Sequence, residues 1–296
     1  MQSGNFFRGG SLTLSEAYQT GMKRLKRAGC ENPAFDTICL MEKNLGADRS
    51  KLAVFGDMPV EDALCSIFFQ DIKKRMAGEP LQYILGEWEF MGLPFRVGKG
   101  VLIPRPDTET LVETALQELK KTECPRVLDL CGGSGCVGIS IAKLCPSSQV
   151  SIVELSETAA VYLRENIQRN QATNASAILG DVLSGPESIQ PLEPVAAVLS
   201  NPPYIPAEEI CSLQREVLAE PEMALDGGKD GLLFYRAIAE KWFSCLAPGG
   251  FAAVECGIHQ ADDVARIFKS AGLQRVQRVK DLCGIERVVI GFTSGG

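Results

Sequence analysis

The tetrapeptide Asn201-Pro202-Pro203-Tyr204 combines residue types that can orient a planar nitrogen for reaction. An amide or arylamine nitrogen is a poor nucleophile while its lone pair is conjugated, so both of its hydrogens must be held and its lone pair aimed. The side-chain oxygen of Asn201 and the main-chain carbonyl of Pro202 can accept those two hydrogens. The prolines fix φ and remove competing N–H donors, and the Tyr204 ring offers a flat stacking face. The pattern predicts group transfer to such a nitrogen without a strong general base.

A second chemical pattern is a glycine-rich run that follows the acid Asp129 and reads Cys131-Gly132-Gly133-Ser134-Gly135. Glycines let the backbone approach a ligand closely, and a helix that starts after them offers unpaired amides. With Gly138, the run also fits the dinucleotide pattern G-x-G-x-x-G, which is a weak signal by itself. In that pattern the first glycine follows the strand directly, whereas here Asp129 comes first. The order resembles the D-x-G-x-G-x-G loop of methyltransferases, and a purely structural turn is the remaining alternative.

Two further acids end the next two predicted strands. Glu154 lies about 20 residues after the glycine run, from where a carboxylate can accept both ribose hydroxyls of an adenosine. Asp181 can accept a hydrogen bond from the adenine amino group, and Val182 beside it can flank the ring. Because ligands of open α/β sheets bind beyond the carboxyl ends of the strands, these residues are expected to hold one adenosine-like ligand.

The elements that must position these groups alternate between strand and helix. Periodicity predicts strands at 127–130, 150–155, 176–179, 195–200 and 251–255, and helices at 137–144, 157–170, 231–246 and 260–271. This alternation indicates parallel strands joined by crossover helices. The last two strands, 273–280 and 286–292, are separated by a turn at Cys283-Gly284 and are expected to pair antiparallel.

The N-terminal part of the sequence has apolar residues at helical spacing and several helix-capping signals. Thr13 and Glu16 fit a capping box, Pro33 fits a first helical position, and Gly46 and Gly78 fit helix ends. A change to alternating residues with aromatics then predicts a β-hairpin. We therefore predict a helical domain over 1–80, a hairpin linker over 81–101 and a second domain, which holds the chemical motifs, over 102–296.

Composition excludes several classes of protein. The 296 residues hold 30 Lys and Arg against 37 Asp and Glu, a net charge of −7, which argues weakly against nucleic acid as the main partner. His259, the single histidine, is interpreted as a helix-start residue, and no metal site is expected. The 11 cysteines include no C-x-x-C spacing, and no apolar run is long enough for a membrane span. We expect a cytoplasmic protein. We interpret Trp88 and Trp242 as packing residues.

Nearly the whole chain resembles the HemK/PrmC protein-glutamine N5-methyltransferases. Besides the tetrapeptide, the segments that carry the resemblance are residues 78–86, 90–93, 101–109, 224–228 and 281–288. The resemblance implies a class I S-adenosylmethionine-dependent methyltransferase fold, a Rossmann-like α/β sheet with an antiparallel terminal hairpin, plus the small helical N-terminal domain. It also implies methylation of the glutamine in the Gly-Gly-Gln motif of class I peptide chain release factors. By the resemblance, residues 1–80 would be the substrate-recognition domain that contacts the release factor, and residues 102–296 the S-adenosylmethionine-dependent methyltransferase domain.

The resemblance assigns roles residue by residue. The run from Cys131 to Gly135, together with Glu154, Val182 and Asn201, would line the S-adenosylmethionine site. Asn201 to Tyr204 would hold the glutamine amide, and Arg105 and Glu109 would brace the entrance. Two positions depart from the family's usual pattern: Cys131 replaces a glycine and Glu154 replaces an aspartate.

Other functions remain open on the sequence. An amino-methyltransferase acting on adenine N6 or guanine N2 of a nucleic acid uses a similar Asn/Asp-Pro-Pro-aromatic loop, but it needs a basic groove. The dense basic cluster at residues 23–27 is more typical of a solvated helix face. A glutamine methyltransferase of a ribosomal protein is a closer alternative. A non-catalytic binding module and an NAD-dependent oxidoreductase fit less well, since neither explains the Pro-Pro loop.

Overall fold

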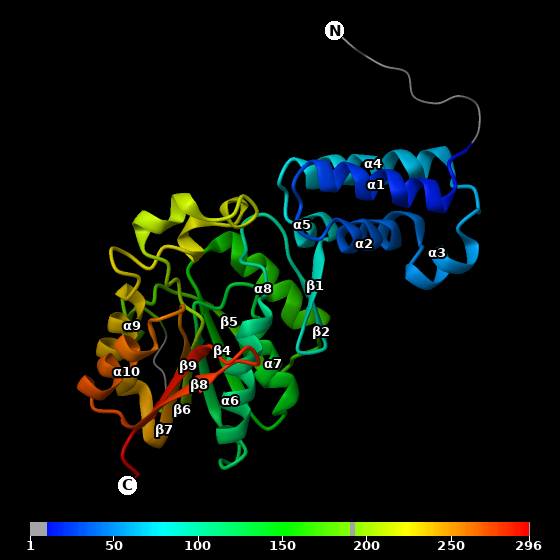
Figure 1. Cartoon of the computed structure of the whole chain (residues 1–296). Helices are drawn as coiled ribbons and strands as arrows, with labels where there is room; N and C mark the ends of the chain where they lie inside the picture. Colours follow the sequence, from blue (N-terminus) through cyan, green and yellow to red (C-terminus); the bar gives the residue numbers. More distant parts are fainter. Residues whose placement is uncertain (1–10, 190–192, 296) are drawn as a thin grey trace. The chain divides into compact units, whose positions relative to one another are not determined.

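The structure, a computed structural model, describes residues 11–189 and 193–295. The chain divides into two compact units, the first ending at Gly86 and the second beginning at Glu87 (Figure 1). The helical unit thus extends beyond residue 80, where the sequence predicts its end. Residues 1–10 of the predicted helical domain and residue 296 of the predicted catalytic domain lie outside the described residues.

The first unit is a small helical bundle. Its helices are α1 (Leu14–Arg27), α2 (Pro33–Leu45), α3 (Arg49–Phe55), α4 (Asp62–Met76) and α5 (Leu81–Leu85). The predicted capping box is present, with Thr13 and Glu16 each accepting the other's backbone N–H. Gly46 ends α2 in the left-handed conformation, at φ 58°. Helices α1, α2 and α4 close on a fully buried core of Leu25, Leu40, Met41, Phe68 and Ile72.

The hairpin is shorter than the predicted span of 81–101. Its strands are β1 (Glu87–Phe90) and β2 (Leu93–Arg96), which pair antiparallel. The residues before it form helix α5, because Pro80 precedes the helix and Gly86, at φ 81°, ends it by donating its N–H to the carbonyl of Gln82. The apolar spacing of this segment belongs to the helix and not to a strand.

The second unit is built on a seven-stranded sheet with the order β5-β4-β3-β6-β7-β9-β8. The strands are β3 (Arg126–Leu130), β4 (Gln149–Glu154), β5 (Ala175–Leu179), β6 (Val195–Ser200), β7 (Leu246–Glu255), β8 (Gln274–Lys280) and β9 (Glu286–Phe292). The first five are parallel, and β9 pairs antiparallel with both β7 and β8. The predicted parallel sheet with an antiparallel end is confirmed.

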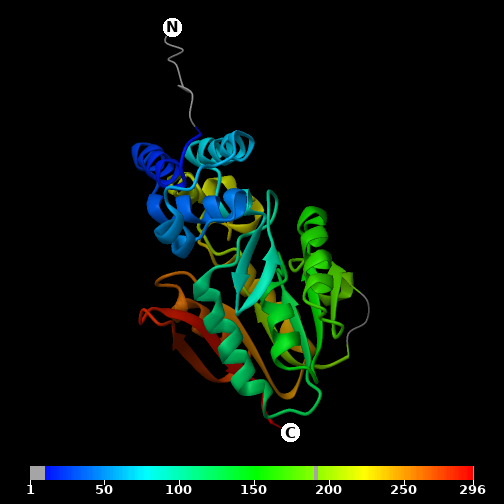
Figure 2. The ribbon, with the colours of Figure 1, turned by 90° about the vertical axis from the view of Figure 1, so that its right-hand side faces the viewer.

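Helices cover both faces of this sheet. Helices α6 (Glu109–Leu119), α7 (Cys136–Leu144) and α8 (Glu157–Arg169) pack on one face, over Val127, Ile152 and Leu199. Figure 2 shows α6 lying over the sheet, with the red strands of the terminal hairpin behind it. Helices α9 (Leu233–Ala237) and α10 (Ala261–Ser270) pack on the other face, over Leu128 and Val198. None of the described helices is both long and apolar enough to cross a membrane.

The segment predicted as one helix over 231–246 is divided in the structure. Helix α9 starts at Leu233 because Gly231 takes a positive φ of 72° and Asp230 accepts the N–H of Leu232. A π-helical turn (Ile238–Trp242) and a 3-10 turn (Phe243–Cys245) follow. The buried Trp242 anchors this irregular end, donating its ring N–H to the carbonyl of Val182 at 2.8 Å.

Candidate active site

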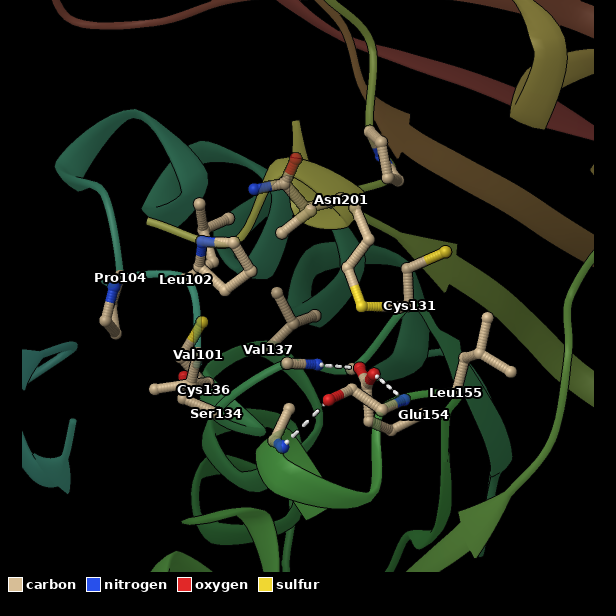
Figure 3. Close-up of a pocket in the computed structure, with 18 of the residues that line it drawn as sticks. Val101, Leu102, Pro104, Cys131, Ser134, Cys136, Val137, Glu154, Leu155 and Asn201 are labelled. Carbon is tan, nitrogen blue, oxygen red and sulfur yellow. Dashed lines mark hydrogen bonds between the residues drawn. The ribbon is translucent and has the colours of Figure 1, made fainter. Parts of the chain in front are cut away.

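One cavity lies at the carboxyl edge of the parallel strands, with about 910 Å³ of empty space that includes its opening to solvent. Its wall comes from the loops after β3, β4 and β6, from the segment 100–105 and from Thr108. Figure 3 shows Asn201 well apart from Glu154, with Cys131 and Val137 between them in the view. The cavity thus brings together groups from distant parts of the chain, as the parallel topology requires.

The cavity includes most of the residues predicted for the site and leaves others outside its wall. Those that line it are Cys131, Gly132, Gly133, Ser134, Glu154, Val182, Asn201, Pro203 and Arg105. Those that do not are Gly135, Asp181, Pro202, Tyr204 and Glu109. The second group includes Asp181, Tyr204 and Glu109, whose side chains make hydrogen bonds elsewhere in the unit.

The glycine loop after β3 is shaped by close packing on one side and open space on the other. A Cβ atom at Gly135 would lie 2.4 Å from Leu163 Cδ1, and one at Gly132 would lie 2.3 Å from Ile152 Cγ2. At Gly133, with φ 55°, a Cβ would meet no atom within 4 Å, and this residue lines the cavity. Close packing therefore requires glycine at Gly132 and Gly135. Gly133 borders open space in the cavity, where a ligand could approach its backbone.

Cys131 occupies a backbone conformation that favours glycine. Its φ is +60°, in the left-handed region that costs an L-residue about 1–2 kcal/mol. This explains why methyltransferase loops usually carry glycine here. Burial raises the pKa of the Cys131 thiol, and the Glu154 carboxylate adds to the effect, so the thiol stays neutral.

Glu154 is held at the end of β4 by two backbone groups. Its Oε2 accepts the N–H of Gly133 at 2.7 Å and its Oε1 accepts the N–H of Ser156 at 2.6 Å, as Figure 3 shows. The side chain is 8% exposed and lines the cavity. Since a carboxylate oxygen has two lone pairs, each oxygen can still accept a hydroxyl from a ligand. The geometry suits a ribose.

A second carboxyl, Asp129, faces the start of helix α7. It accepts the N–H of Gly138 at 2.8 Å, and burial raises its pKa to about 7. In dinucleotide sites the amides of the glycine loop and helix start face a pyrophosphate. Here the carboxyl groups of Glu154 and Asp129 accept two of those amides, at Gly133 and Gly138, so these N–H groups are not available to a phosphate. The cavity therefore suits ribose hydroxyls and a sulfonium better than an anion, and S-adenosylmethionine fits these residues.

Asp181 and Glu109 make contacts away from the cavity. The Asp181 carboxylate accepts the N–H of Leu183 and the hydroxyl of Ser184, so it stabilises its own turn. Glu109 accepts the N–H of Met91 at 2.8 Å and thereby fixes the bend of the β1–β2 hairpin. Val182, next to Asp181, is the residue of that turn that reaches the cavity.

Arg105 is held beside the cavity by a buried acid. It pairs with Glu220, which is 6% exposed and also accepts the N–H of Ile103 at 3.0 Å. One carboxylate thus ties the segment 101–105 to the chain that follows the tetrapeptide. Sequence reasoning missed Glu220, because nothing in the local pattern relates it to a residue 115 positions away.

The tetrapeptide follows strand β6 directly, and its side chains point to different surroundings. Asn201 lines the cavity and donates from Nδ2 to the Thr108 hydroxyl at 3.0 Å. The Tyr204 hydroxyl donates to Glu255 at 3.3 Å, and the Tyr204 carbonyl accepts from Gln260 at 2.9 Å. Burial raises the pKa of Tyr204, with the Glu255 carboxyl contributing.

Sequence reasoning also missed Thr108 and the apolar part of the wall. Thr108 belongs to the segment 101–109 that carries the family resemblance, and this was the signal that could have identified it. Among the other cavity residues are Leu102, Met223 and Phe234. These apolar residues carry no local mark that separates them from core positions.

The comparisons with known proteins agree with this geometry. The chain matches the models of the PrmC N-terminal domain over residues 16–86 and of the methyltransferase small domain over residues 107–235. A methyltransferase from Pyrococcus furiosus is 19% identical, with a TM-score of 0.51 over 69% of this chain and 91% of that one. The fold is that of class I S-adenosylmethionine-dependent methyltransferases, as predicted.

Relatives resemble the chain along most of its length. The release factor glutamine methyltransferase of Clostridium botulinum is 36% identical over 280 residues, which cover 94% of this chain and 98% of that protein. The protein of the same name from Geobacter sulfurreducens is 40% identical over 268 residues, 90% of this chain and 92% of that protein. With such relatives over nearly its full length, the chain belongs to the release factor glutamine methyltransferase family.

Proposed function

We propose that this protein transfers a methyl group from S-adenosylmethionine to the side-chain amide nitrogen of the glutamine in the Gly-Gly-Gln motif of class I peptide chain release factors. The observation that carries the proposal is that Asn201 lines the same cavity as Glu154 and the glycine loop. An amide acceptor therefore lies beside a cradle suited to an adenosine. The family's activity on release factors supports the choice of substrate.

The tetrapeptide would hold the glutamine amide. In the proposal the Asn201 Oδ1 and the Pro202 carbonyl accept the two hydrogens of the substrate NH₂ group, which fixes the nitrogen and turns its lone pair toward the donor. The bound donor supplies an electrophilic methyl group on a sulfonium, a good leaving group. Positioning then accounts for most of the rate enhancement, in keeping with a chain that has a single histidine.

The charges of the cavity support this donor. Glu154 and Asp129 both line the cavity beside the glycine loop, and the Glu154 carboxylate can attract a cation and accept hydroxyls. In the proposal Glu154 accepts the ribose hydroxyls, Val182 flanks the adenine ring, and Arg105 borders the side on which the substrate enters. The helical unit would recognise the release factor, in the cytoplasm where translation terminates.

The proposal is tested by offering the protein labelled S-adenosylmethionine with four separate acceptors: a class I release factor, tRNA, rRNA and DNA. We expect label in the release factor alone. A release factor whose motif glutamine is replaced by alanine is the matched control and should stay unlabelled. Label in nucleic acid but not in the release factor would overturn the proposal, as would preferential labelling of a ribosomal protein added in competition.

A further inference from the structure

The two prolines of the tetrapeptide leave its middle without backbone donors. Neither Pro202 nor Pro203 has an N–H group, so this segment cannot be held in place by hydrogen bonds that its own backbone donates. In the proposed function the Pro202 carbonyl must nevertheless keep a fixed position, because it accepts one hydrogen of the substrate amide. The residues on either side of the prolines must therefore position that carbonyl.

The chain before the prolines is held by the sheet, and the chain after them is held by loops. Strand β6 pairs with β3 and β7, and the Ser200 hydroxyl donates to the Leu130 carbonyl at 2.7 Å. After the prolines, the backbone of residues 205–207 exchanges hydrogen bonds with residues 225–228. The carbonyl of Tyr204 itself accepts from a side chain, the Nε2 of Gln260, at 2.9 Å.

The neighbours of Gln260 fix which end of its amide faces the tetrapeptide. Its Oε1 accepts the N–H of Gly257 at 2.9 Å, and a backbone N–H can only donate. Its Nε2 donates to the carbonyls of Tyr204 and Gly231, at 2.9 and 3.4 Å, and a carbonyl oxygen can only accept. The reversed amide would place oxygen against oxygen and NH₂ against N–H. The Gln260 amide therefore has one orientation, set by groups that cannot change their role.

The side chain of Gln260 does not serve its own helix. Gln260 is the N-cap residue of α10, a position where a short polar side chain usually accepts a backbone N–H of the first turn. The Gln260 side chain makes no such cap and contacts the tetrapeptide instead. His259 before it takes a left-handed φ of 72°, which costs about 1–2 kcal/mol. This turn thus carries strain and lacks a side-chain cap while it brings an amide to the Tyr204 carbonyl.

Glycines allow the backbone to close around this contact. A Cβ atom at Gly231 would lie 2.5 Å from Gln260 Nε2, and one at Gly257 would lie 2.8 Å from Gln260 Oε1. A Cβ atom at Gly227 would lie 2.7 Å from Tyr204 Cα. Side chains at these three positions would displace either the Gln260 amide or the main chain of Tyr204.

We infer that Gln260 is a positioning residue, which fixes the end of the tetrapeptide through the Tyr204 carbonyl and thereby sets the place of the Pro202 carbonyl. The rings of Pro202 and Pro203 fix their φ angles, so the path between the two carbonyls has few ways to bend. This inference rests on the proposed function, in which the Pro202 carbonyl holds the substrate amide.

The test compares Gln260→Met, which keeps the length and removes both polar groups, with Gln260→Glu, which keeps the acceptor for Gly257 and loses the donor. Both are assayed at about pH 8.5, well above the usual glutamate pKa of about 4.3. We expect kcat for release factor methylation to fall about tenfold in both variants, and the Kd for S-adenosylmethionine to stay within about twofold of the parent. Gln168→Glu, exposed on α8, is the matched control and should keep the parent kcat.

A parent kcat in either Gln260 variant would overturn the inference. If only Gln260→Met lost activity, the bond from Gly257 would explain the loss, and if only Gln260→Glu did, the added charge would explain it. A rise in Kd as large as the fall in kcat would also contradict the inference, because the whole site would then be disturbed. If Gln260→Met does not fold, Gln260→Glu decides alone, since it keeps the shape and the bond from Gly257.

A second readout does not depend on methyl transfer. With carbon-13 in the tyrosine carbonyls and nitrogen-15 in isoleucine, the sequence pairs Tyr83-Ile84 and Tyr204-Ile205 each give one carbonyl–amide signal. The Tyr204 signal should move in both Gln260 variants, while the Tyr83 signal, from the helical unit, stays as the reference. A parent that methylates no release factor counts against the proposed function. A Tyr204 signal that does not move counts against the contact with Gln260 alone.

Discussion

The carboxylate of Glu154 accepts the backbone N–H of Gly133 at 2.7 Å, which joins the end of β4 to the glycine loop after β3. One side chain thus shapes the loop and lines the cavity. An acid at this position also stops the loop amide from binding a phosphate. This hydrogen bond explains why the glycine-rich loop suits a nucleoside that carries no pyrophosphate.

Replacing Glu154 by glutamine should weaken S-adenosylmethionine binding. The amide has one acceptor oxygen in place of two, so it cannot serve both Gly133 and Ser156 and still accept ribose hydroxyls. We expect Kd, measured by calorimetry, to rise by about tenfold or more. The exposed Glu157→Gln, at the start of α8, is the matched control. Equal affinities of the two variants would show that Glu154 does not contact the donor.

Replacing Cys131 tests the strain in the glycine loop. Both Cys131→Ala and Cys131→Gly remove the sulfur, but only glycine relieves the cost of a φ of +60°. Glycine is normally less stable than alanine, yet here we expect Cys131→Gly to unfold with a free energy about 1 kcal/mol higher than Cys131→Ala. Denaturant unfolding measures the difference. An alanine variant as stable as the glycine variant would mean that the loop carries no such strain.

Glu220 should control both stability and donor binding. Glu220→Ala leaves the N–H of buried Ile103 and the Arg105 side chain without their common partner, at a cost of about 2 kcal/mol. Because the segment 101–105 lines the cavity, the Kd for S-adenosylmethionine should rise as well. Glu222→Ala, an exposed acid nearby, should change neither quantity. A Glu220→Ala variant with the stability of the parent and the same Kd for S-adenosylmethionine would show that Glu220 does not stabilise the site.

The raised pKa of the buried Glu255 should make the stability of the protein depend on pH. Burial raises its pKa from 4.5 to about 7, while Thr108, Arg287 and Tyr204 lower it in part and Asp107 adds to the rise. The folded state therefore holds this proton more tightly than the unfolded state does. Between about pH 4.5 and pH 7 the free energy of unfolding should fall as pH rises, by at most about 1.4 kcal/mol per pH unit from this group.

The Glu255→Gln variant isolates this effect. Because glutamine does not titrate, the stability difference between parent and variant should change across that pH window and stay constant above about pH 7. Denaturant unfolding at pH 5, 6, 7 and 8 measures it. Parallel pH curves for the two proteins would show that Glu255 holds no shifted proton.

The fold was predictable because its signals are local. Continuous apolar runs such as β6 and helical spacing such as α8 reflect burial against a sheet, and β6 lies at its predicted residues, 195–200. Asn201 and Glu154 were predictable because strand ends in a parallel sheet share one edge. The π-helical turn at Ile238–Trp242 was not, since it depends on how Trp242 packs against Val182.

The rest of the site depends on contacts between distant residues. Arg105 with Glu220 and Thr108 with Asn201 join positions 115 and 93 residues apart, and no periodicity encodes such pairs. Asp181 accepts the N–H of Leu183, a local bond that acids often make, and its contact with an adenine stays a prediction. An acid at a strand end can therefore serve either a ligand or its own turn.

Mass spectrometry can locate the methyl group on a release factor that has been incubated with this protein and S-adenosylmethionine. We expect one added methyl group on the side chain of the Gly-Gly-Gln glutamine, and none when Asn201→Ala, which should bind S-adenosylmethionine normally, replaces the parent. A methyl group at another residue, or undiminished transfer by Asn201→Ala with normal donor affinity, would contradict the proposed function.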